Sequence, residues 1–407
     1  MAHMGHDVVC VDIDPEKVAR LREGIIPIVE LGLSELVVEG ISTGRLSFVV
    51  GAAEVVEKCE IVFLCVPTPQ GEDGSADLSY VEAAAREISK ALPFESIVVN
   101  KSTVPVGSTK VVERALRRSD VKVVSNPEFL REGSAVQDFL KPDRIVVGSD
   151  DQGAALKVAS LYDGLTTRVI ITDPASAETI KYAANAFLAT KLSFINAIAA
   201  ICEGVGADID DVVVGMGSDK RIGENFLRPG PGWGGSCFPK DSRALIKIAE
   251  GAGYDFDLLK GVVSVNDQQF DRVAAKVTDA VGGDVRGKTV AVWGLTFKAG
   301  TDDLRDSPAV SVVSRLLERG ARVVAFDPTV SQPRPGVPAG IDLAGTEVDA
   351  CRDADTLIVL TEWDQFKWVP PHDVAAVMAG RAVVDGRNLL DRNTWRKAGF
   401  THVGIGR

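Results

Sequence analysis

The first 172 residues alternate between short apolar runs and stretches in which apolar residues recur every three or four positions. Five runs predict buried strands: HDVVCVD (6–12), EIVFLCVP (60–67), SIVVNKS (96–102), VKVVSNP (121–127) and RIVVG (144–148). The intervening stretches PEKVARLRE, LSYVEAAAREISKAL and STKVVERALRR predict helices. Continuously apolar strands that alternate with helices indicate a parallel sheet covered on both faces.

The pattern changes after residue 172. Residues 176–204, SAETIKYAANAFLATKLSFINAIAAICEG, are rich in Ala, contain no Pro and predict one long helix. Helical spacing continues to about Val281, interrupted by RPGPGWGG (228–235). Strand signals return in KTVAVWG (288–294), ARVVAFDP (321–328), DTLIVLTEW (355–363) and RAVVDGRN (381–388). We therefore expect an α/β protein with an α/β domain at 1–172, a helical middle segment at 173–281 and a second α/β domain at 282–407.

The strand VVCVDID ends in an acidic residue, Asp12. In dinucleotide-binding (Rossmann-like) folds such a residue closes the second strand and binds the adenosine ribose, although a turn residue or helix cap before Pro15 would look the same. The first strand and its GxGxxG loop belong roughly 20 residues upstream of that acid, but only eleven residues, with the single glycine Gly5, precede Asp12. We expect the chain to begin inside its first βαβ unit, so that either the true start lies upstream or this product binds dinucleotide poorly.

Composition favours a globular protein and disfavours nucleic-acid-binding, secreted, membrane-spanning and metal-binding classes. Hydrophobic residues make up 45% and charged residues 25% of the 407 residues, as in ordinary globular proteins. The net charge of −12 disfavours nucleic acid as a partner. Neither a secretory signal nor a membrane-spanning run is expected. Six scattered cysteines and four unpaired histidines favour a reducing cytoplasm and predict no metal site.

The segment GWGGSCFPKD places Cys237 among glycines and directly before a predicted helix that contains Pro239. The helix N-terminus and Lys240 would favour a thiolate, and Asp241 lies one turn away from the sulfur. The glycines would let a substrate carbon approach the sulfur. The alternative is a small buried cysteine of purely structural use.

Other polar residues stand out against apolar surroundings. Lys181 and Asn185 share one face of the long helix and could be aimed at an oxyanion, or could form a solvated stripe. Thr103 in NKSTVPVGST and Glu128 with Glu132 in NPEFLREG follow strands, at the sheet edge where α/β folds bind ligands, although caps and surface acids are commoner there. Lys298 and Arg305 in GLTFKAGTDDLRDSP could hold phosphates or a dinucleotide, or form surface ion pairs.

Five motifs occur in one order along the chain: STVPVGST, NPEFLREG, ETIKYAANAFLATK, GGSCFPKD and GLTFKAGTDDLRDSP. With them the sequence resembles the UDP-glucose/GDP-mannose dehydrogenase family over essentially its whole length. GGSCFPKD is similar to the UDP-glucose branch, whereas the UDP-N-acetyl-hexosamine branch reads more like GGHCIPVD and the GDP-mannose branch tends to have Leu after the Cys.

The resemblance implies oxidation of the C6 alcohol of UDP-glucose to a carboxylate in two NAD-dependent steps. Cys237 would trap the C6 aldehyde as a thiohemiacetal that becomes a thioester, and Lys181 and Asn185 would stabilise oxyanions. Thr103, Glu128 and Asp241 would activate water or relay protons. The implied NAD contacts are Asp12, Lys17, Thr68, Thr103, Glu132, Lys240 and Arg305. The implied substrate contacts are Glu128, Phe129, Leu130, Arg131, Glu132, Lys181, Asn185, Arg221, Phe226, Leu227, Arg228, Pro229, Gly230, Gly234 and Lys298.

The resemblance also implies a homodimer through the long helix, with Arg221 reaching a neighbouring subunit's substrate, and a cytoplasmic enzyme with no membrane or nucleic-acid partner. It assigns NAD binding to residues 1–172, dimerisation to 173–281 and UDP-sugar binding to 282–407. Two alternatives stay open at this point. One is a nucleotide-sugar-binding protein with impaired redox activity, because the glycine loop is absent. The other is the same chemistry on GDP-mannose or a UDP-N-acetyl-hexosamine.

Overall fold

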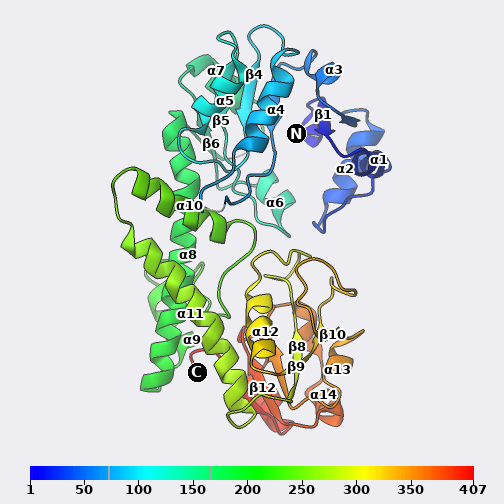
Figure 1. Cartoon of the computed structure of the whole chain (residues 1–407), viewed down its shortest axis with the longest axis vertical. Coiled ribbons are helices and arrows are strands. Elements are labelled where there is room, and N and C mark those ends of the chain that lie inside the picture. The colour runs from blue at the N-terminus through cyan, green and yellow to red at the C-terminus, as the bar shows by residue number, and fades with distance from the viewer. Residues whose placement is uncertain (72–73, 166) are drawn as a thin grey trace. The chain divides into compact units, whose positions relative to one another are not determined.

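A computed structural model describes residues 1–71, 74–165 and 167–407 of the chain (Figure 1). The chain divides into two compact units, Met1–Ala184 with Arg243–Tyr254, and Asn185–Ser242 with Asp255–Arg407. The division falls inside helix α8 (Pro174–Val205) and again inside helix α10 (Phe238–Gly251), so each of these helices supplies residues to both units.

The first unit contains a five-stranded sheet in the order β3-β4-β5-β6-β7. Its strands are β3 (Ile61–Leu64), β4 (Ile97–Asn100), β5 (Lys122–Ser125), β6 (Arg144–Gly148) and β7 (Arg168–Thr172). The predicted parallel sheet is wrong at one pair, because β5 and β6 pair antiparallel through Ser125 and Gly148. An apolar run reveals burial but not direction, and only the six-residue helix α6 (Ala135–Leu140) connects these two strands.

Helices pack on this sheet through apolar side chains. They are α3 (Ala53–Val56), α4 (Ser79–Ser89), α5 (Ser108–Leu116) and α7 (Gln152–Ser160). One apolar cluster joins α4 and α5 to Leu64, Val98 and Val123, and a second joins α7 to Ile97, Val99 and Val124. Successive β4 residues thus enter different clusters, which explains the uninterrupted apolar run in the sequence.

Strands β1 (Val8–Asp12) and β2 (Leu46–Val50) form a separate two-stranded parallel sheet in the first unit (Figure 1). Helices α1 (Pro15–Arg22) and α2 (Leu33–Ser42) pack on it through Val18, Val37 and Phe48, and the short helix η1 (Ala2–Met4) precedes it. Val9 and Val11 of β1 are each 39% exposed. In the described part of the chain β1 therefore pairs with β2 and leaves its other edge without a strand.

The second unit has a six-stranded parallel sheet in the order β10-β9-β8-β11-β12-β13. Its strands are β8 (Thr289–Trp293), β9 (Arg322–Phe326), β10 (Ile341–Leu343), β11 (Thr356–Val359), β12 (Ala382–Asp385) and β13 (Thr401–Val403). This is the 3-2-1-4-5-6 order of a doubly wound dinucleotide-binding fold. On that template β1 and β2 of the first unit correspond to strands two and three.

Both faces of the six-stranded sheet are covered. On one face α11 (Asp257–Ala280) and α12 (Pro308–Glu318) pack against Val290 and Val292 (Figure 1). On the other, α13 (Glu347–Ala350), the short helix η2 (Asp364–Trp368), α14 (Pro371–Val377) and α15 (Arg392–Lys397) surround Trp293. The carboxyl ends of β8 and β11 meet where the strand order reverses, which is the place where such sheets bind ligands.

The middle segment is helical, as predicted, and consists of α8, α9 (Ile209–Gly217), α10 and α11. Among the described residues, α8 alone is long and apolar enough to cross a membrane by length and composition. Buried helices of globular proteins meet the same criteria, and α8 carries the buried polar residues Glu178, Lys181 and Asn185.

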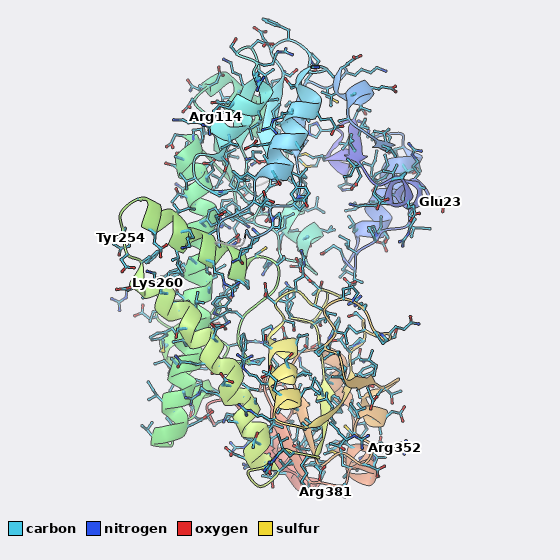
Figure 2. All side chains as sticks on the ribbon, viewed as in Figure 1. Glu23, Arg114, Tyr254, Lys260, Arg352 and Arg381 are labelled. Atoms are coloured by element: carbon cyan, nitrogen blue, oxygen red, sulfur yellow. The ribbon has the colours of Figure 1, made fainter. Side chains whose placement is uncertain are left out.

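Most charged side chains lie on the outside of each unit. Glu23 and Arg114 are exposed in the first, and Arg352 and Arg381 in the second (Figure 2). Against this background, five Asp, Glu, Lys or Arg side chains of the described residues are buried: Glu178, Lys181, Asp241, Asp327 and Asp385. Burying a charge costs free energy unless it is paired and hydrogen-bonded, so these residues mark the places where chemistry is expected.

Candidate active site

In the first unit the buried Lys181 pairs with Glu128. Its Nζ lies 3.0 Å from Oε1 of Glu128, while Oε2 of that carboxylate accepts the Leu130 N–H at 2.6 Å. The Lys181 ammonium also lies 5.4 Å from the ring centre of Phe129. Lys181 is 3% exposed, so it does not belong to a solvated stripe. A desolvated ammonium beside a carboxylate can stabilise an oxyanion and pass a proton to its partner.

Thr103 lies in a loop that is held at both ends. The Thr68 hydroxyl donates to the Thr103 carbonyl at 2.8 Å, and Thr68 itself is buried. The carboxylate of Glu178, one turn before Lys181, accepts from Gly107 N–H at 2.6 Å and Thr109 N–H at 2.9 Å. Burial raises the pKa of Glu178. Sequence reasoning missed Glu178, although its spacing of three from Lys181 placed it on the same helix face.

The loop from Glu128 to Glu132 ends at α6. Arg131 donates to Asp138 through its backbone N–H at 2.9 Å and its Nε at 3.0 Å, so its guanidinium already has a carboxylate partner. Glu30 accepts from the N–H groups of Gly133 and Ala135, at 2.7 and 2.8 Å. Leu130 is 37% exposed, and Glu132 is half-buried. Glu30 was not predicted, because no local pattern pairs residues more than 100 positions apart. Asp138, seven residues after Arg131, was not predicted either.

Asp12 ends β1 as predicted and accepts from Lys17, with 2.5 Å between Oδ2 and Nζ. That hydrogen bond lowers the pKa of Asp12. A partly exposed carboxylate at this strand end fits the hydroxyls of an adenosine ribose. Among the described residues, no glycine-rich turn between a strand and a helix precedes Asp12.

In the second unit Asn185, Asp241 and Lys240 form one hydrogen-bonded group. Asn185 Nδ2 donates to Asp241 Oδ2 at 2.6 Å, and Lys240 Nζ lies 2.6 Å from Asp241 Oδ1. Asn185 is 7% exposed and Asp241 is fully buried. Both oxygens of Asp241 are thus engaged, which fixes the carboxylate in place.

Cys237 directly precedes α10, which begins at Phe238. Its sulfur lies 3.5 Å from the Ser236 hydroxyl, and its carbonyl accepts the Asp241 N–H at 2.9 Å. Cys237 is half-buried, whereas Cys202 and Cys351 are buried. The positive end of the helix dipole favours a thiolate at this position.

The glycines beside Cys237 serve a different purpose from the predicted one. A Cβ on Gly232 would lie 2.6 Å from the Phe270 ring, one on Gly234 1.9 Å from the Asp306 carbonyl, and one on Gly235 2.8 Å from the Phe297 ring. Atoms of the protein itself therefore occupy the space that a side chain would take at these three positions. Close packing explains why each position needs glycine.

Residues 226–230, which precede the glycines, differ in their exposure and contacts. Phe226 adopts φ 62°, and its ring lies 6.3 Å from that of Phe238. Leu227 is 1% exposed and belongs to the apolar core, so only its backbone remains for substrate. Arg228 is exposed, and Pro229 and Gly230 are buried.

Arg387 is a residue that sequence reasoning missed. Its guanidinium donates to the carbonyls of Leu360 at 2.8 Å and Phe297 at 3.0 Å, and lies 3.1 Å from Glu362. Phe297 precedes Lys298, whose Nζ lies 5.4 Å from the Phe297 ring centre. Arg387 thus brings the loops after β8, β11 and β12 together at the point where the strand order reverses.

Asp327 directly follows β9, much as Asp12 closes β1, but it is 2% exposed. Its Oδ2 accepts from the N–H groups of Leu295 and Thr296, at 2.8 and 3.1 Å. Because this carboxylate accepts from backbone N–H groups, it is not available to bind a ribose. The second unit therefore has the strand order of a dinucleotide-binding fold but lacks the acidic residue that would bind the ribose.

Arg221 and Arg305 are highly exposed. Arg221 pairs with Asp219 at 2.6 Å and its side chain is 88% exposed, and Arg305 pairs with Asp303 at 2.7 Å and is 68% exposed. The surface ion pair considered for Arg305 is therefore present. The described residues contain no group of three or more His, Cys, Asp or Glu side chains that could hold a metal ion.

Three family models match successive parts of the chain. The NAD binding domain of the UDP-glucose/GDP-mannose dehydrogenase family matches residues 1–166, its central domain 175–268 and its UDP binding domain 291–392. The chain belongs to the UDP-glucose/GDP-mannose dehydrogenase family.

Curated members of this dehydrogenase family cover the whole chain. The UDP-glucose 6-dehydrogenases of Rhizobium meliloti and Pseudomonas aeruginosa are 46% and 45% identical to it, over 95% and 93% of their own lengths. A solved UDP-glucose dehydrogenase from Pyrobaculum islandicum, 40% identical, superimposes with a TM-score of 0.92 over 100% of this chain and 93% of its own. A UDP-D-ManNAc dehydrogenase from Pyrococcus horikoshii is 26% identical and gives 0.88, over 100% of this chain and 95% of its own.

Proposed function

We propose that the protein oxidises UDP-glucose to UDP-glucuronate in two steps with NAD as the oxidant. The observation that carries the proposal is a half-buried cysteine at the start of α10, in the same unit as a buried Asn185–Asp241–Lys240 group. The identity of 45–46% to two UDP-glucose 6-dehydrogenases over the whole chain favours UDP-glucose over other nucleotide sugars.

NAD, when bound, accepts the hydrides that leave C6 of the sugar. In our proposal Lys181 and Asn185 stabilise the negative charge that develops on the C6 oxygen in each step. The thiolate of Cys237 adds to the carbon of the C6 aldehyde, forming the C–S bond of a thiohemiacetal. Covalent attachment keeps the half-oxidised sugar in place until its second hydride has left.

Loss of that hydride leaves a thioester on Cys237. Water then adds to the thioester carbon, the C–S bond breaks, and the sulfur departs as a thiolate. We assign the removal of the water proton to Asp241, with Glu128 and Thr103 as further positioning or proton-relay groups. Asp241 suits this role because Asn185 and Lys240 fix its orientation while leaving it a carboxylate lone pair for water.

For the cofactor we propose Asp12 and Lys17 at the adenosine ribose, with Thr68, Thr103, Glu132, Lys240 and Arg305 as further contacts. For UDP-glucose we propose residues 128–132, 226–230, Gly234, Lys181, Asn185 and Lys298, with Arg221 acting on a neighbouring subunit. The matches to an NAD binding and a UDP binding domain support this assignment. We retain the domain boundaries at residues 172 and 281 as part of the proposal.

We further propose a homodimer formed through α8. Phe187, Phe194 and Ile201 are spaced by seven residues and are 65%, 49% and 56% exposed. A row of large apolar side chains at this spacing lies along one side of a helix, and its burial against a second copy would remove it from water. A cytoplasmic location is part of the same proposal and fits the six free cysteines.

A coupled assay on the 407-residue chain tests the function. We expect UDP-glucose to be converted to UDP-glucuronate with two equivalents of reduced NAD per sugar, and GDP-mannose and UDP-N-acetyl-hexosamines to be poor substrates. Calorimetry with UDP-glucose and with NAD accompanies the assay. Tight UDP-glucose binding without NAD binding or turnover would replace the proposal with a nucleotide-sugar-binding protein.

A further inference from the structure

We propose that Asn196, Asn266 and Gln269 are positioning residues that fix the loop from Gly230 to Gly235, and through it Cys237, for the reaction proposed above. All three are buried, with exposed fractions of 3–5%. Asn196 comes from α8, and Asn266 and Gln269 come from α11, three residues apart on one face of that helix. None of them belongs to the predicted site.

The side-chain amides of these three residues form hydrogen bonds with the backbone of the loop. Asn196 Oδ1 accepts the Gly230 N–H at 2.9 Å, and Gln269 Nε2 donates to the Gly230 carbonyl at 2.7 Å. Asn266 Oδ1 accepts the Trp233 N–H at 2.8 Å, while its Nδ2 donates to the Trp233 carbonyl at 3.0 Å. Asn266 thus bonds both peptide groups of one residue, as a neighbouring β-strand would.

The Trp233 side chain is held as well. Its Nε1 donates to the Ser193 hydroxyl at 2.8 Å, and Ser193 donates in turn to the Val262 carbonyl at 2.8 Å. Because Ser193 lies on α8 and Val262 on α11, the indole closes a chain of hydrogen bonds between these two helices. Trp233 is 5% exposed, so these bonds are shielded from water.

The need for amides follows from the loop's backbone. Residues 228–235 form neither helix nor strand, so their buried N–H and C=O groups need partners from side chains. A primary amide offers a donor and an acceptor without a charge, whereas a carboxylate offers acceptors only. A hydrocarbon of equal size would leave buried peptide groups without hydrogen-bond partners, which is unfavourable.

The loop leads directly to the reactive sulfur. Gly232 packs against the ring of Phe270, which follows Gln269 on α11, and Cys237 comes two residues after Gly235. A shift of the peptide at Gly230 or Trp233 therefore moves Cys237 relative to Asn185 and Asp241, which lie in the same unit. A displacement of 1 Å at such a place can cost about 100-fold in rate.

The test compares Gln269→Met with Gln268→Met, a matched change at the adjacent, exposed glutamine. Both variants are first shown to be folded by circular dichroism and thermal unfolding. Two kinds of measurement follow. One is the rate at which iodoacetamide alkylates Cys237, and the other is steady-state kinetics, which gives KM and kcat for UDP-glucose and for NAD.

We expect Gln269→Met to change the alkylation rate several-fold and to lower kcat/KM for UDP-glucose by about 10- to 100-fold, with KM for NAD unchanged. Gln268→Met is expected to match the wild type in every readout. A folded Gln269→Met protein with wild-type alkylation and wild-type kinetics would overturn the proposal. If Gln269→Met does not fold, Asn196→Ser, which leaves room for a water, undergoes the same measurements with the same criteria.

The alkylation rate requires no turnover. A wild-type chain that fails to oxidise UDP-glucose would therefore refute the proposed function, while the alkylation rates would still decide whether the three amides position Cys237.

Discussion

Asn185 Nδ2 lies 2.6 Å from Asp241 Oδ2, and both side chains are buried. The amide of one helix thus orients the carboxylate of another, four residues after Cys237. Lys240 balances the buried charge from the other oxygen of Asp241. These two partners explain how the Asp241 side chain is held out of solvent, close in sequence to the proposed nucleophile.

Asp241→Asn is expected to slow thioester hydrolysis, because it preserves the shape of the side chain but removes the base. We expect kcat to fall by about 100- to 10,000-fold, with UDP-glucose binding retained. The thioester then accumulates, and mass spectrometry of the acid-quenched enzyme finds the added glucuronyl nucleotide on the peptide that contains Cys237. The control is Asp267→Asn at an exposed position of α11. Equal rates for the two variants would remove Asp241 from the mechanism.

Lys101 should make stability depend on pH above neutrality. Burial lowers the pKa of Lys101 to about 8, with Cys65 and Glu128 raising it and Lys181 lowering it further. The unfolded chain keeps this proton to about pH 10.5, so between pH 8 and 10.5 it holds more protons than the folded protein, and raising the pH favours folding. Urea titrations give the free energy of unfolding of the wild type and of Lys101→Met. The wild-type value minus the variant value should rise between pH 8 and 10.5. A difference that does not change with pH would contradict the lowered pKa of Lys101.

Gly234→Ala should destabilise the second unit. Its Cβ would lie 1.9 Å from the Asp306 carbonyl, so the backbone must move at a cost of about 1–3 kcal/mol. Gly261→Ala is the matched control, because its Cβ meets nothing within 4 Å and it lies inside α11. That change should stabilise the protein by up to about 1 kcal/mol. Urea unfolding measures both, and equal effects would show that the close approach at Gly234 is not rigid.

Phe194→Asp should weaken the proposed homodimer. It places a charge in the middle of the exposed row on α8, where burial against a second copy would cost several kcal/mol. Sedimentation equilibrium is expected to show a dimer for the wild type and a monomer for the variant. Phe94→Asp, at a phenylalanine that is 75% exposed outside that row, should leave the dimer intact. A monomeric wild-type protein would refute this part of the proposal.

Individual helices and strands could be predicted where the sequence carries strong local patterns. The run RIVVG matches β6 without error, and the Ala-rich stretch at 176–204 matches α8 within two residues. Short or half-exposed strands such as β2, β10 and β13 were missed, because three to five residues with mixed burial give little periodicity.

The site was predictable only in part, for a physical reason. Cys237 and Asp241 share one short motif, and Lys181 and Asn185 share one helix, so local spacing was enough to select them. Their partners come from elsewhere in the chain. The Glu178 carboxylate is separated from Thr109 by 69 residues and the Gln269 amide from Gly230 by 39, and no local pattern encodes such pairs.

The glycines of GWGGSC illustrate the same limit. Their number suggested open space for a substrate, because an absent side chain looks the same whether a ligand or a protein atom takes its place. Only the contacts with Asp306, Phe270 and Phe297 show which of the two applies.

Covalent catalysis by Cys237 is tested by the rate at which Cys237→Ser forms UDP-glucuronate. The control is Cys59→Ser, at another half-buried cysteine. A hydroxyl in place of the thiol should bind UDP-glucose nearly as well, but it cannot form the thioester. We expect Cys237→Ser to produce no UDP-glucuronate above background, while Cys59→Ser matches the wild type. UDP-glucuronate formed by Cys237→Ser at the wild-type rate would contradict covalent catalysis by Cys237.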